Sequence, residues 1–404
     1  MKRELYCKIW EELSKEKPMV FLSGPRQAGK TTFARKVSAT FANSTYFNWD
    51  LVTNKRLLIE KPTFFEEINR KDDSKPLVVL DEIHKYKKWK NYLKGIYDEF
   101  SNRYQFLVLG SGRLNVFQKG GDSLAGRYFL FTLWPFTLAE LAHHQKPFEE
   151  FMNDPLKMEV ADRSTEKIWN RLSYLGGFPE PYLSGKETFY RKWSAGYSQQ
   201  LIREDIRNMT AIKDVDSMEI LFSLLPSRIG SPLSMASLAR DVQVSFNSIR
   251  DWLEIFESFF LVFRIPSWGK KIARAIIKEK KLYLYDYAHI SNPPEKFENM
   301  IALELWRAVS NWNDLGLGDF GLHYVRNKER EEADFLVTNN HKPIFLVEAK
   351  LSDVAPSKSL LKFQSVLNVP AIQLVNKPSI HKIISNHKQQ TLIVTASRWL
   401  STLP

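Results

Sequence analysis

The sequence predicts an α/β protein built from several domains rather than from one core. Three observations lead to this fold class. Short apolar runs alternate with helical stretches over the first 145 residues, a largely helical pattern follows, and a second group of strands and helices occupies the C-terminal part. A chain of 404 residues is also too long for one ordinary hydrophobic core. The expected domains are residues 1–145, 146–230, 231–290 and 291–404.

The composition is that of a folded protein in a reducing compartment. Apolar residues make up 44% and charged residues 26% of the chain, which excludes a disordered polymer or a fibre. The single cysteine, Cys7, excludes an internal disulfide and a cysteine-based zinc site, so we expect a cytoplasmic protein. The apolar run from Phe129 to Ala142 contains Pro135 and is too short to cross a bilayer, so no membrane segment is expected.

The charge balance favours an acidic partner. The chain carries 58 Lys and Arg against 46 Asp and Glu, a net charge of +12. An excess of this size is typical of nucleic-acid-binding proteins, although many basic proteins bind no nucleic acid. DNA is therefore the expected partner only if motifs support it.

The first 145 residues have the pattern of a parallel sheet covered by helices. The expected strands are Met19–Ser23, Thr45–Trp49, Leu77–Leu80 and Phe106–Leu109, and the expected helices are Lys30–Ala39 and Trp89–Phe100. Uniformly apolar strands alternating with helices indicate a sheet buried on both faces.

A phosphate-binding loop follows the first strand. The segment matches G-x-x-x-x-G-K-[ST] and, with the next residue, comprises Gly24, Pro25, Arg26, Gln27, Ala28, Gly29, Lys30, Thr31 and Thr32. Backbone N–H groups of such a loop surround phosphate oxygens, Lys30 reaches the β and γ phosphates, and Thr31 offers a hydroxyl to Mg²⁺. No guanine-reading signature stands out, so ATP and Mg²⁺ are the expected cofactors.

Two acids end the strand that begins at Leu77. Asp81 is expected to hold Mg²⁺, and Glu82 is expected to polarise the attacking water. The next strand ends near Ser111, which is placed to sense the γ-phosphate. Arg113 or Arg127 is expected to stabilise transition-state charge, either within one subunit or across a homo-oligomer, with a surface ion pair as the alternative for each arginine.

The middle of the chain has the pattern of a winged helix-turn-helix. After a turn at Gly176-Gly177-Phe178-Pro179, helices are expected at Ser234–Val242 and Phe246–Glu257, with Ser245 as an N-cap. The strands Phe260–Ile265 and Leu282–Tyr285 then flank a basic stretch, whose members are Lys270, Lys271, Arg274, Lys278, Lys280 and Lys281. Asn247, Ser248 and Arg250 are expected to meet DNA bases and the basic stretch to grip phosphates, although such folds also serve as protein contacts.

An acidic hairpin follows the expected linker Asn292-Pro293-Pro294 and a helix from Phe297 to Val309. If residues 339–343 form a five-residue loop, Asp334 faces Glu348. Two facing carboxylates require a cation between them, and Lys350 is placed to activate water, which is the D…E-x-K pattern of Mg²⁺-dependent phosphodiester hydrolysis. Glu298 or Glu304 is expected to add a third carboxylate. The alternative is a Glu–Lys pair on an exposed strand face.

Together these residues resemble a bacterial and archaeal family of AAA-type P-loop ATPases that carry a C-terminal domain of unknown function with a PD-(D/E)xK restriction-endonuclease-like fold. The resemblance runs through GPRQAGKTT, VVLDEIHK, LGSGRL, SLAGRY, LGGFPEPYL, LIREDI, KLYLYDYA, FENMIALEL, EEADFLV and LVEAK. It implies ATP hydrolysis and a nuclease-like site, with positions matched at Lys30, Thr31, Asp81, Glu82, Glu298, Asp334, Glu348 and Lys350. Ser111 departs from the asparagine of many AAA proteins.

Two functions are expected from this combination. The first is an ATP-driven enzyme that binds DNA and cuts or remodels it with Mg²⁺, in genome defence or repair. The second is a regulatory ATPase whose nucleotide state switches DNA or protein binding, and whose nuclease-like domain does not cleave. The acidic hairpin separates them, because the two hypotheses share every motif up to residue 290.

Overall fold

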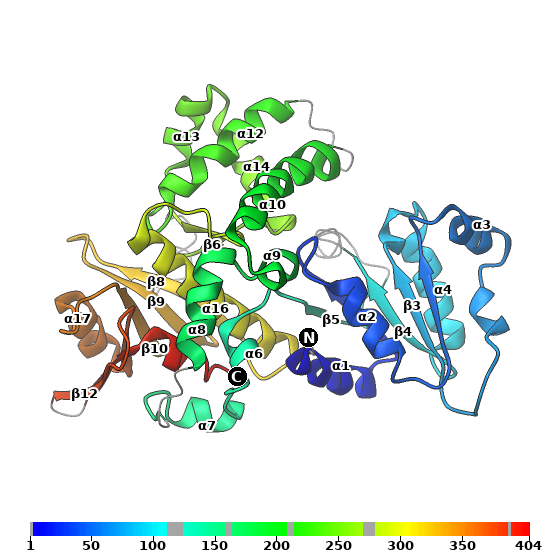
Figure 1. Cartoon of the computed structure of the whole chain (residues 1–404), viewed down its shortest axis with the longest axis horizontal. Helices are drawn as coiled ribbons and strands as arrows, with labels where there is room; N and C mark the ends of the chain where they lie inside the picture. The colour runs from blue at the N-terminus through cyan, green and yellow to red at the C-terminus, as the bar shows by residue number, and fades with distance from the viewer. Residues whose placement is uncertain (1–2, 111–123, 159–163, 208–213, 270–278, 387–388) are drawn as a thin grey trace. The chain divides into compact units, whose positions relative to one another are not determined.

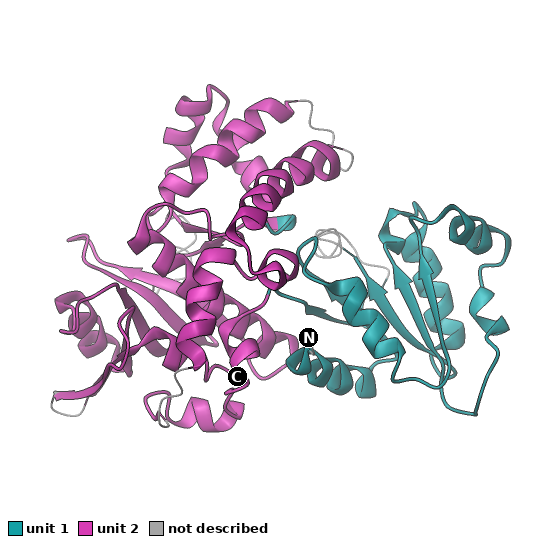
Figure 2. Cartoon of the chain, in the orientation of Figure 1, with its two compact units in different colours: residues 1–135, 258–260 teal, residues 136–257, 261–404 magenta. Residues whose placement is uncertain are grey.

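The computed structural model describes residues 3–110, 124–158, 164–207, 214–269, 279–386 and 389–404 (Figure 1). The chain forms two compact units (Figure 2): unit 1 comprises residues 1–135 and 258–260, and unit 2 comprises residues 136–257 and 261–404. Within the described ranges, no helix combines the length and the apolar character needed to cross a membrane.

Unit 1 is built on a five-stranded sheet in the order β2-β3-β4-β1-β5. The strands are β1 (Met19–Ser23), β2 (Ser44–Asn48), β3 (Leu77–Asp81), β4 (Gln105–Leu109) and β5 (Phe129–Thr132). Every neighbouring pair is parallel. The predicted parallel sheet is therefore confirmed, with β5 as a strand that the sequence pattern did not reveal.

Both faces of this sheet are buried. On β1, Phe21 belongs to a core cluster that also contains Val78 and Leu80 of β3, while the alternating residue Leu22 is fully buried on the opposite face. The sheet is flanked by α2 (Lys30–Ser38) on one side and α4 (Trp89–Phe100) on the other (Figure 1). Further helical segments among the described residues of unit 1 are α1 (Glu4–Glu16), α3 (Val52–Glu60), η1 (Phe64–Glu67) and η2 (Ile83–Lys85). Burial by helices on both faces explains why the strands are uniformly apolar in sequence.

Unit 2 begins with a helical region. Its elements are α6 (Leu138–Ala142), α7 (Phe148–Asn153), α8 (Ser164–Leu175), α9 (Pro179–Ser184), α10 (Glu187–Gln200), η4 (Leu201–Ile206), α12 (Val215–Leu224) and η5 (Leu225–Arg228). The predicted turn is confirmed, because Gly176 has φ +66° directly after α8 and Pro179 opens α9.

The helix-turn-helix pattern is present in the structure. Helix α13 (Met235–Val242) and helix α14 (Phe246–Ser258) are joined by the predicted three-residue turn, and Oγ of Ser245 accepts a hydrogen bond of 3.0 Å from the N–H of Ser248. The antiparallel strands β6 (Val262–Ile265) and β7 (Lys281–Leu284) follow. Lys270, Lys271, Arg274 and Lys278 lie outside the described residues.

The expected linker at residues 292–294 is wrong. Asn292 is the N-cap of a 22-residue helix, α16 (Pro293–Asp314), in which Pro293 and Pro294 occupy the first helical positions. A proline is well suited to the first turn because its missing N–H has no helical partner there. The helix therefore starts four residues before the predicted start at Phe297.

The C-terminal part of unit 2 is a six-stranded mixed sheet in the order β12-β13-β11-β10-β9-β8. Its elements along the chain are β8 (Phe320–Arg326), β9 (Glu332–Asn339), β10 (Lys342–Lys350), α17 (Lys358–Leu367), β11 (Ala371–Val375), β12 (His381–Asn386), β13 (Gln389–Thr395) and α18 (Ala396–Leu400). Strands β8 to β10 are antiparallel neighbours, whereas β10, β11 and β13 run parallel. Helix α17 covers one face, with Leu360 packed in a cluster with Leu336 and Leu346.

The predicted five-residue loop of the acidic hairpin is also wrong, yet the predicted register is right. Strands β9 and β10 are joined by a two-residue turn at Asn340-His341, both in the left-handed region. An irregularity between Pro343 and Phe345 then shifts the pairing by one residue, so that Phe335 is opposite Val347. Asp334 and Glu348 therefore face each other, as the sequence predicted.

Candidate functional site

The phosphate loop lies between β1 and α2, and its backbone needs glycine at two positions. Gly24 has φ +143°, and a Cβ there would stand 2.3 Å from the carbonyl oxygen of Leu133. Gly29, with φ +95°, is the residue immediately before α2. The loop therefore curls tightly around the start of the helix, where the first helical N–H groups are available to bind an anion.

The side chain of Lys30 lies inside this loop. Its ammonium donates hydrogen bonds to the carbonyl oxygens of Gly24 at 2.9 Å and Pro25 at 2.7 Å, and the residue is 8% exposed. Burial lowers the pKa of Lys30 to about 8, against the opposing effect of Glu82 and Asp81. A phosphate group would supply the negative charge that this buried ammonium lacks.

Thr31 and Asp81 are brought together from two elements. The Thr31 hydroxyl, at the start of α2, donates a 2.8 Å hydrogen bond to Oδ2 of Asp81 at the end of β3. The hydroxyl of Tyr46, on β2, donates a short hydrogen bond to the same oxygen. Burial and this hydrogen bond raise the pKa of Tyr46, so the phenol stays protonated and positions Asp81. Tyr46 was not predicted from the sequence, where its only signal is its place on the strand next to the one that Asp81 ends.

Glu82 is held by a neighbouring lysine. Its backbone is left-handed, with φ +57°, and its N–H donates to the carbonyl oxygen of Leu109 at 3.2 Å. Nζ of Lys85 lies 3.1 Å from Oε2 of Glu82 and within 2.7 Å of the Asp50 carboxylate. The predicted water-polarising carboxylate therefore has a cation beside it.

The predicted arginine is engaged at the surface of unit 1. Nε of Arg127 lies 2.7 Å from Oδ1 of Asp98 on α4. This contact is the surface ion pair that was the alternative expected for Arg127. Ser111 and Arg113 lie outside the described residues.

The residues at this site fit a nucleotide-bound Mg²⁺. Mg²⁺ is commonly held by one or two protein oxygens together with phosphate oxygens and water. Thr31 and Asp81 present a hydroxyl and a carboxylate 2.8 Å apart, next to the loop that holds Lys30. These two residues would hold the ion.

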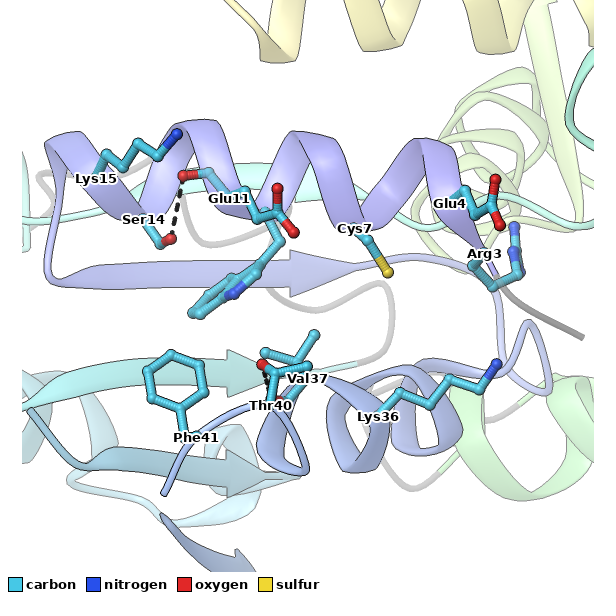
Figure 3. A pocket seen from close by; sticks show the side chains of 11 residues that line it. Arg3, Glu4, Cys7, Glu11, Ser14, Lys15, Lys36, Val37, Thr40 and Phe41 are labelled. Carbon is cyan, nitrogen blue, oxygen red and sulfur yellow. Dashed lines mark hydrogen bonds between the residues drawn. The ribbon is translucent and has the colours of Figure 1, made fainter. Parts of the chain in front are cut away.

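A separate cavity of about 560 Å³ lies beside α1. Figure 3 shows Cys7 and Glu11 of α1 facing Lys36, Val37 and Thr40. Its lining contains no residue of the phosphate loop, 24–31. Burial raises the pKa of the Cys7 thiol, so this cysteine is not an activated nucleophile.

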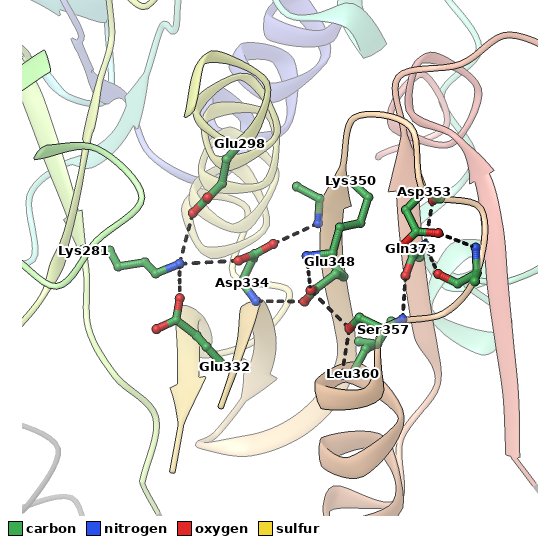
Figure 4. Close-up of polar contacts among 12 residues, drawn as sticks. Lys281, Glu298, Glu332, Asp334, Glu348, Lys350, Asp353, Ser357, Leu360 and Gln373 are labelled. Atoms are coloured by element: carbon green, nitrogen blue, oxygen red, sulfur yellow. Dashed lines mark hydrogen bonds and ion pairs between the residues drawn. The ribbon is translucent and has the colours of Figure 1, made fainter. Parts of the chain in front are cut away.

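The acidic site of unit 2 gathers the predicted carboxylates around two lysines (Figure 4). Asp334, on β9, accepts a hydrogen bond of 2.9 Å at Oδ2 from the N–H of Ala349, and its own N–H donates to Oε2 of Glu348 at 3.4 Å. Nζ of Lys350 lies 2.8 Å from Oε1 of Glu348, which also accepts a 3.2 Å hydrogen bond from Ser357. The predicted Asp334, Glu348 and Lys350 are thus neighbours.

Lys281 completes this site and was not predicted there. Its ammonium, from β7, lies 3.0 Å from Glu298 on α16, 2.6 Å from Glu332 and 3.5 Å from Asp334. The lysine is fully buried. The expectation that Lys281 grips DNA phosphates is therefore wrong, because its charge is used inside the protein.

The pKa values at the acidic site are displaced. Burial raises the pKa of Glu298 to about 7, and the charge of Asp334 adds to this effect, while Lys281 opposes it. The same two causes raise the pKa of Glu348 to about 7, against the effect of Lys350. Burial lowers the pKa of Lys281, but the surrounding acidic groups together raise it well above its usual value. Lys281 is therefore a permanent cation at neutral pH.

This site does not fit a divalent metal as it stands. In the ranges that the structure describes, no group of three or more His, Cys, Asp or Glu side chains is arranged to hold a metal ion. The carboxylates that would ligate one already bind Lys281 and Lys350. Glu304 is not an alternative ligand, because its Oε1 accepts a 2.7 Å hydrogen bond from the N–H of Leu138 at the start of α6.

Comparison with known families assigns a class to the first part of the chain. Residues 16–142 match the family model of an AAA domain, and residues 166–291 match the model of a domain of unknown function. The phosphate loop, β3 and its terminal acids all lie in the first of these ranges. Residues 16–142 are therefore similar to AAA domains, and this match supports an AAA-type ATPase.

Individual relatives are distant. An uncharacterized protein of Mycobacterium tuberculosis is 22% identical over 351 residues, which is 85% of this chain and 73% of that protein, and one of Mycobacterium bovis matches equally. Among solved structures, a Walker-type ATPase of Pyrococcus abyssi is 16% identical with a TM-score of 0.42, covering 65% of this chain and 90% of that one. The ORC1 protein of Aeropyrum pernix, solved in complex with DNA, is 14% identical with a TM-score of 0.33, covering 72% and 92%.

Proposed function

We propose that the AAA-type domain binds Mg²⁺-ATP and hydrolyses it. The observation that carries this proposal is the contact of Thr31 with Asp81 at 2.8 Å, beside the loop that encloses Lys30. In this proposal Lys30 neutralises the phosphates, and Thr31 and Asp81 would hold the metal. Glu82 orients the attacking water after its carboxylate has separated from Lys85. Bound Mg²⁺ would supply charge stabilisation to the transferring phosphoryl group.

Titration calorimetry with Mg²⁺-ATP tests this proposal directly. We expect heat of binding for the wild type and none for Lys30→Ala. Because no other nucleotide site is proposed, an absence of heat with the wild type would end the ATPase hypothesis. Mg²⁺-GTP in the same assay tests the choice of base, with weaker binding expected.

Arg127 is proposed to stabilise the transition state, either in its own subunit or in a neighbouring one, after leaving Asp98. ATPase turnover of Arg127→Ala, measured over a range of protein concentrations, should be lower than that of the wild type. Arg103→Ala is the matched control, since Arg103 is another surface arginine of unit 1 paired with an acid, 3.7 Å from Glu66. Unchanged turnover would remove Arg127 from the mechanism.

We propose DNA as the partner of residues 226–290, which carry ten basic and six acidic residues. Two helices joined by a tight turn support this proposal, and Asn247 and Arg250 are exposed on the second of them, α14. ATP occupancy would then control DNA binding. An oligomer and a cytoplasmic location are further predictions from the sequence.

Fluorescence anisotropy with duplex DNA at several salt concentrations tests this contact. The affinity should fall as the salt concentration rises, because the contact with DNA is electrostatic. Arg250→Ala should weaken binding by about 1–3 kcal/mol, the loss expected when an arginine that contacts a base is removed. Arg191→Ala on α10, an exposed arginine of the same unit, is the control. Equal binding by all three proteins would remove α14 from the DNA interface.

For the C-terminal part we propose a restriction-endonuclease-like domain that does not cleave in this conformation. The order of α16, β8, β9, β10, α17 and β11 supports the fold, and Asp334 opposite Glu348 supports the site. Engagement of these acids by lysines favours the regulatory ATPase over the nuclease. Plasmid, linear and branched DNA, with and without ATP, should therefore be cut no faster by the wild type than by Asp334→Ala. Cutting that depends on Asp334 would restore the nuclease hypothesis.

A further inference from the structure

The ammonium of Lys281 occupies the centre of the acidic site. Its three carboxylate neighbours come from two elements: Glu298 from α16, and Glu332 and Asp334 from β9. Figure 4 shows the lysine entering from β7, with these acids converging on its tip. A cation that is contributed by one element thus joins carboxylates contributed by two others.

The contacts around this ammonium make it a built site rather than a surface ion pair. Burying an ammonium without partners costs several kcal/mol, and the same holds for each carboxylate. The hydroxyl of Tyr283 donates a 2.8 Å hydrogen bond to Oε1 of Glu298, the oxygen that also meets Lys281. Gly230 lies behind this carboxylate, since a Cβ there would stand 2.9 Å from Oε2 of Glu298. The lysine and its acids are therefore fixed in place by their surroundings.

The carboxylates of the acidic site already have cations of the protein as partners. Four carboxylates gather there, those of Glu298, Glu332, Asp334 and Glu348, and two ammonium groups lie among them, those of Lys281 and Lys350. Arg326 adds a third cation, 3.7 Å from Glu332. A divalent ion needs these carboxylate oxygens as ligands. It would be repelled by the ammonium of Lys281, which already contacts the same oxygens.

We propose that Lys281 is the resident cation of the acidic site: its ammonium lies among Glu298, Glu332 and Asp334, engages two of the expected metal ligands, Glu298 and Asp334, and so keeps divalent metals out. Removing this ammonium would convert the same carboxylates into a site for Mg²⁺ or Mn²⁺. The inference rests on the proposed nuclease-like assignment only for the expectation that a divalent metal belongs there. Strand β7 thereby supplies the side chain that excludes divalent metals from the acidic site.

Binding of Mn²⁺ to the full chain, monitored by electron paramagnetic resonance, tests whether Lys281 excludes divalent metals. All proteins carry Asp81→Asn, so that the nucleotide site loses its carboxylate ligand. In this background we expect no ordered Mn²⁺ site up to about 1 mM, a concentration that fills weak carboxylate sites. Lys281→Met should bind Mn²⁺ at least about tenfold more tightly than its parent, a factor typical of changes next to a metal site. Adding Asp334→Asn to Lys281→Met should abolish the gained site.

Two control variants locate the effect. Lys280→Met removes the preceding, exposed lysine and should leave Mn²⁺ binding as in the parent protein. Lys281→Arg keeps a cation in place and should also gain no site. A gain of equal size in Lys280→Met would overturn the proposal, because it would then reflect net charge alone.

The parent protein alone is able to overturn the proposal, whether or not Lys281→Met folds. A Mn²⁺ site in the parent that disappears with Asp334→Asn would show that Lys281 does not exclude metal. A folded Lys281→Met without a gained site would also refute it. The DNA cleavage and nucleotide assays use other readouts, so their failure would leave this measurement standing.

Discussion

The hydroxyl of Thr31 donates a 2.8 Å hydrogen bond to Oδ2 of Asp81, which joins the start of α2 to the end of β3. The two residues are 50 positions apart in the sequence. Their contact exists because β3 lies in the same parallel sheet as β1, whose following loop opens α2. Parallel strands deliver their carboxyl ends to one edge of a sheet, where ligands of α/β proteins bind.

Tyr46 positions Asp81, so its hydroxyl should matter for catalysis. Tyr46→Phe removes the donor to Oδ2 but keeps the ring. We expect ATPase turnover to fall by about tenfold and the Mg²⁺ concentration for half-maximal rate to rise, as for other residues that orient metal ligands. Tyr92→Phe is the control, since its hydroxyl binds the carbonyl oxygen of Pro62. An unchanged Mg²⁺ dependence in Tyr46→Phe would contradict this role.

Nucleotide binding should take up protons at alkaline pH. Burial holds the pKa of Lys30 at about 8 in the free protein, and a bound triphosphate raises it again. At pH 8 about half of the molecules must therefore gain a proton on binding ATP, against about a tenth at pH 7, and affinity should decline as the pH rises above 8. Calorimetry in buffers of different ionisation enthalpy measures this uptake. Lys30→Arg, which stays charged, should show no proton uptake on binding ATP. Wild-type binding at pH 8 without proton uptake would refute the protonation of Lys30 by bound ATP.

Glu304 should make unit 2 less stable at neutral pH than at pH 5. Burial raises its folded-state pKa from 4.5 to about 7, so the folded protein holds this proton more tightly than the unfolded chain. The contribution of Glu304 to the free energy of unfolding therefore decreases as the pH rises from 4.5 to 7, and it is constant above that range. The loss is on the order of 3 kcal/mol.

Glu304→Gln keeps an oxygen that accepts from the N–H of Leu138 and removes the charge. Urea unfolding at pH 5 and pH 8 should show a smaller decrease in unfolding free energy for this variant than for the wild type. Glu149→Gln, an exposed acid on α7, serves as the comparison and should follow the wild type. Parallel pH profiles for all three proteins would contradict the prediction.

Gly24 should not tolerate a side chain. Gly24→Ala places a Cβ 2.3 Å from the carbonyl oxygen of Leu133, so β1 and the segment after β5 must separate. Such overpacking costs about 1–3 kcal/mol. Gly95→Ala on α4 meets no atom within 4 Å and should instead stabilise its helix by about 0.5–1 kcal/mol. Hydrogen exchange of peptides from β1 and α4 reports both changes, and equal protection of β1 in wild type and Gly24→Ala would exclude the clash.

Local pattern predicted many of the strands and helices and the register of the acidic hairpin. The phosphate loop is contiguous, so spacing alone placed Lys30 and Thr31 at the start of α2. Strand alternation placed Asp334 opposite Glu348 even though the turn between them is shorter than predicted, because the bulge at Pro343 restored the register. The linker prediction failed at Pro293, since proline favours helix starts as well as breaks.

The sequence by itself determined which groups are available: a phosphate loop, the acids that end β3, and a D…E-x-K hairpin. The tertiary structure alone decided what each group meets. Tyr46 reaches Asp81 and Lys281 reaches Glu298 and Asp334 across strand and helix contacts that no local spacing encodes. The physical reason is that a buried charge is stabilised by whichever opposite charge the packing places within a few ångströms, and packing joins segments that are distant in sequence.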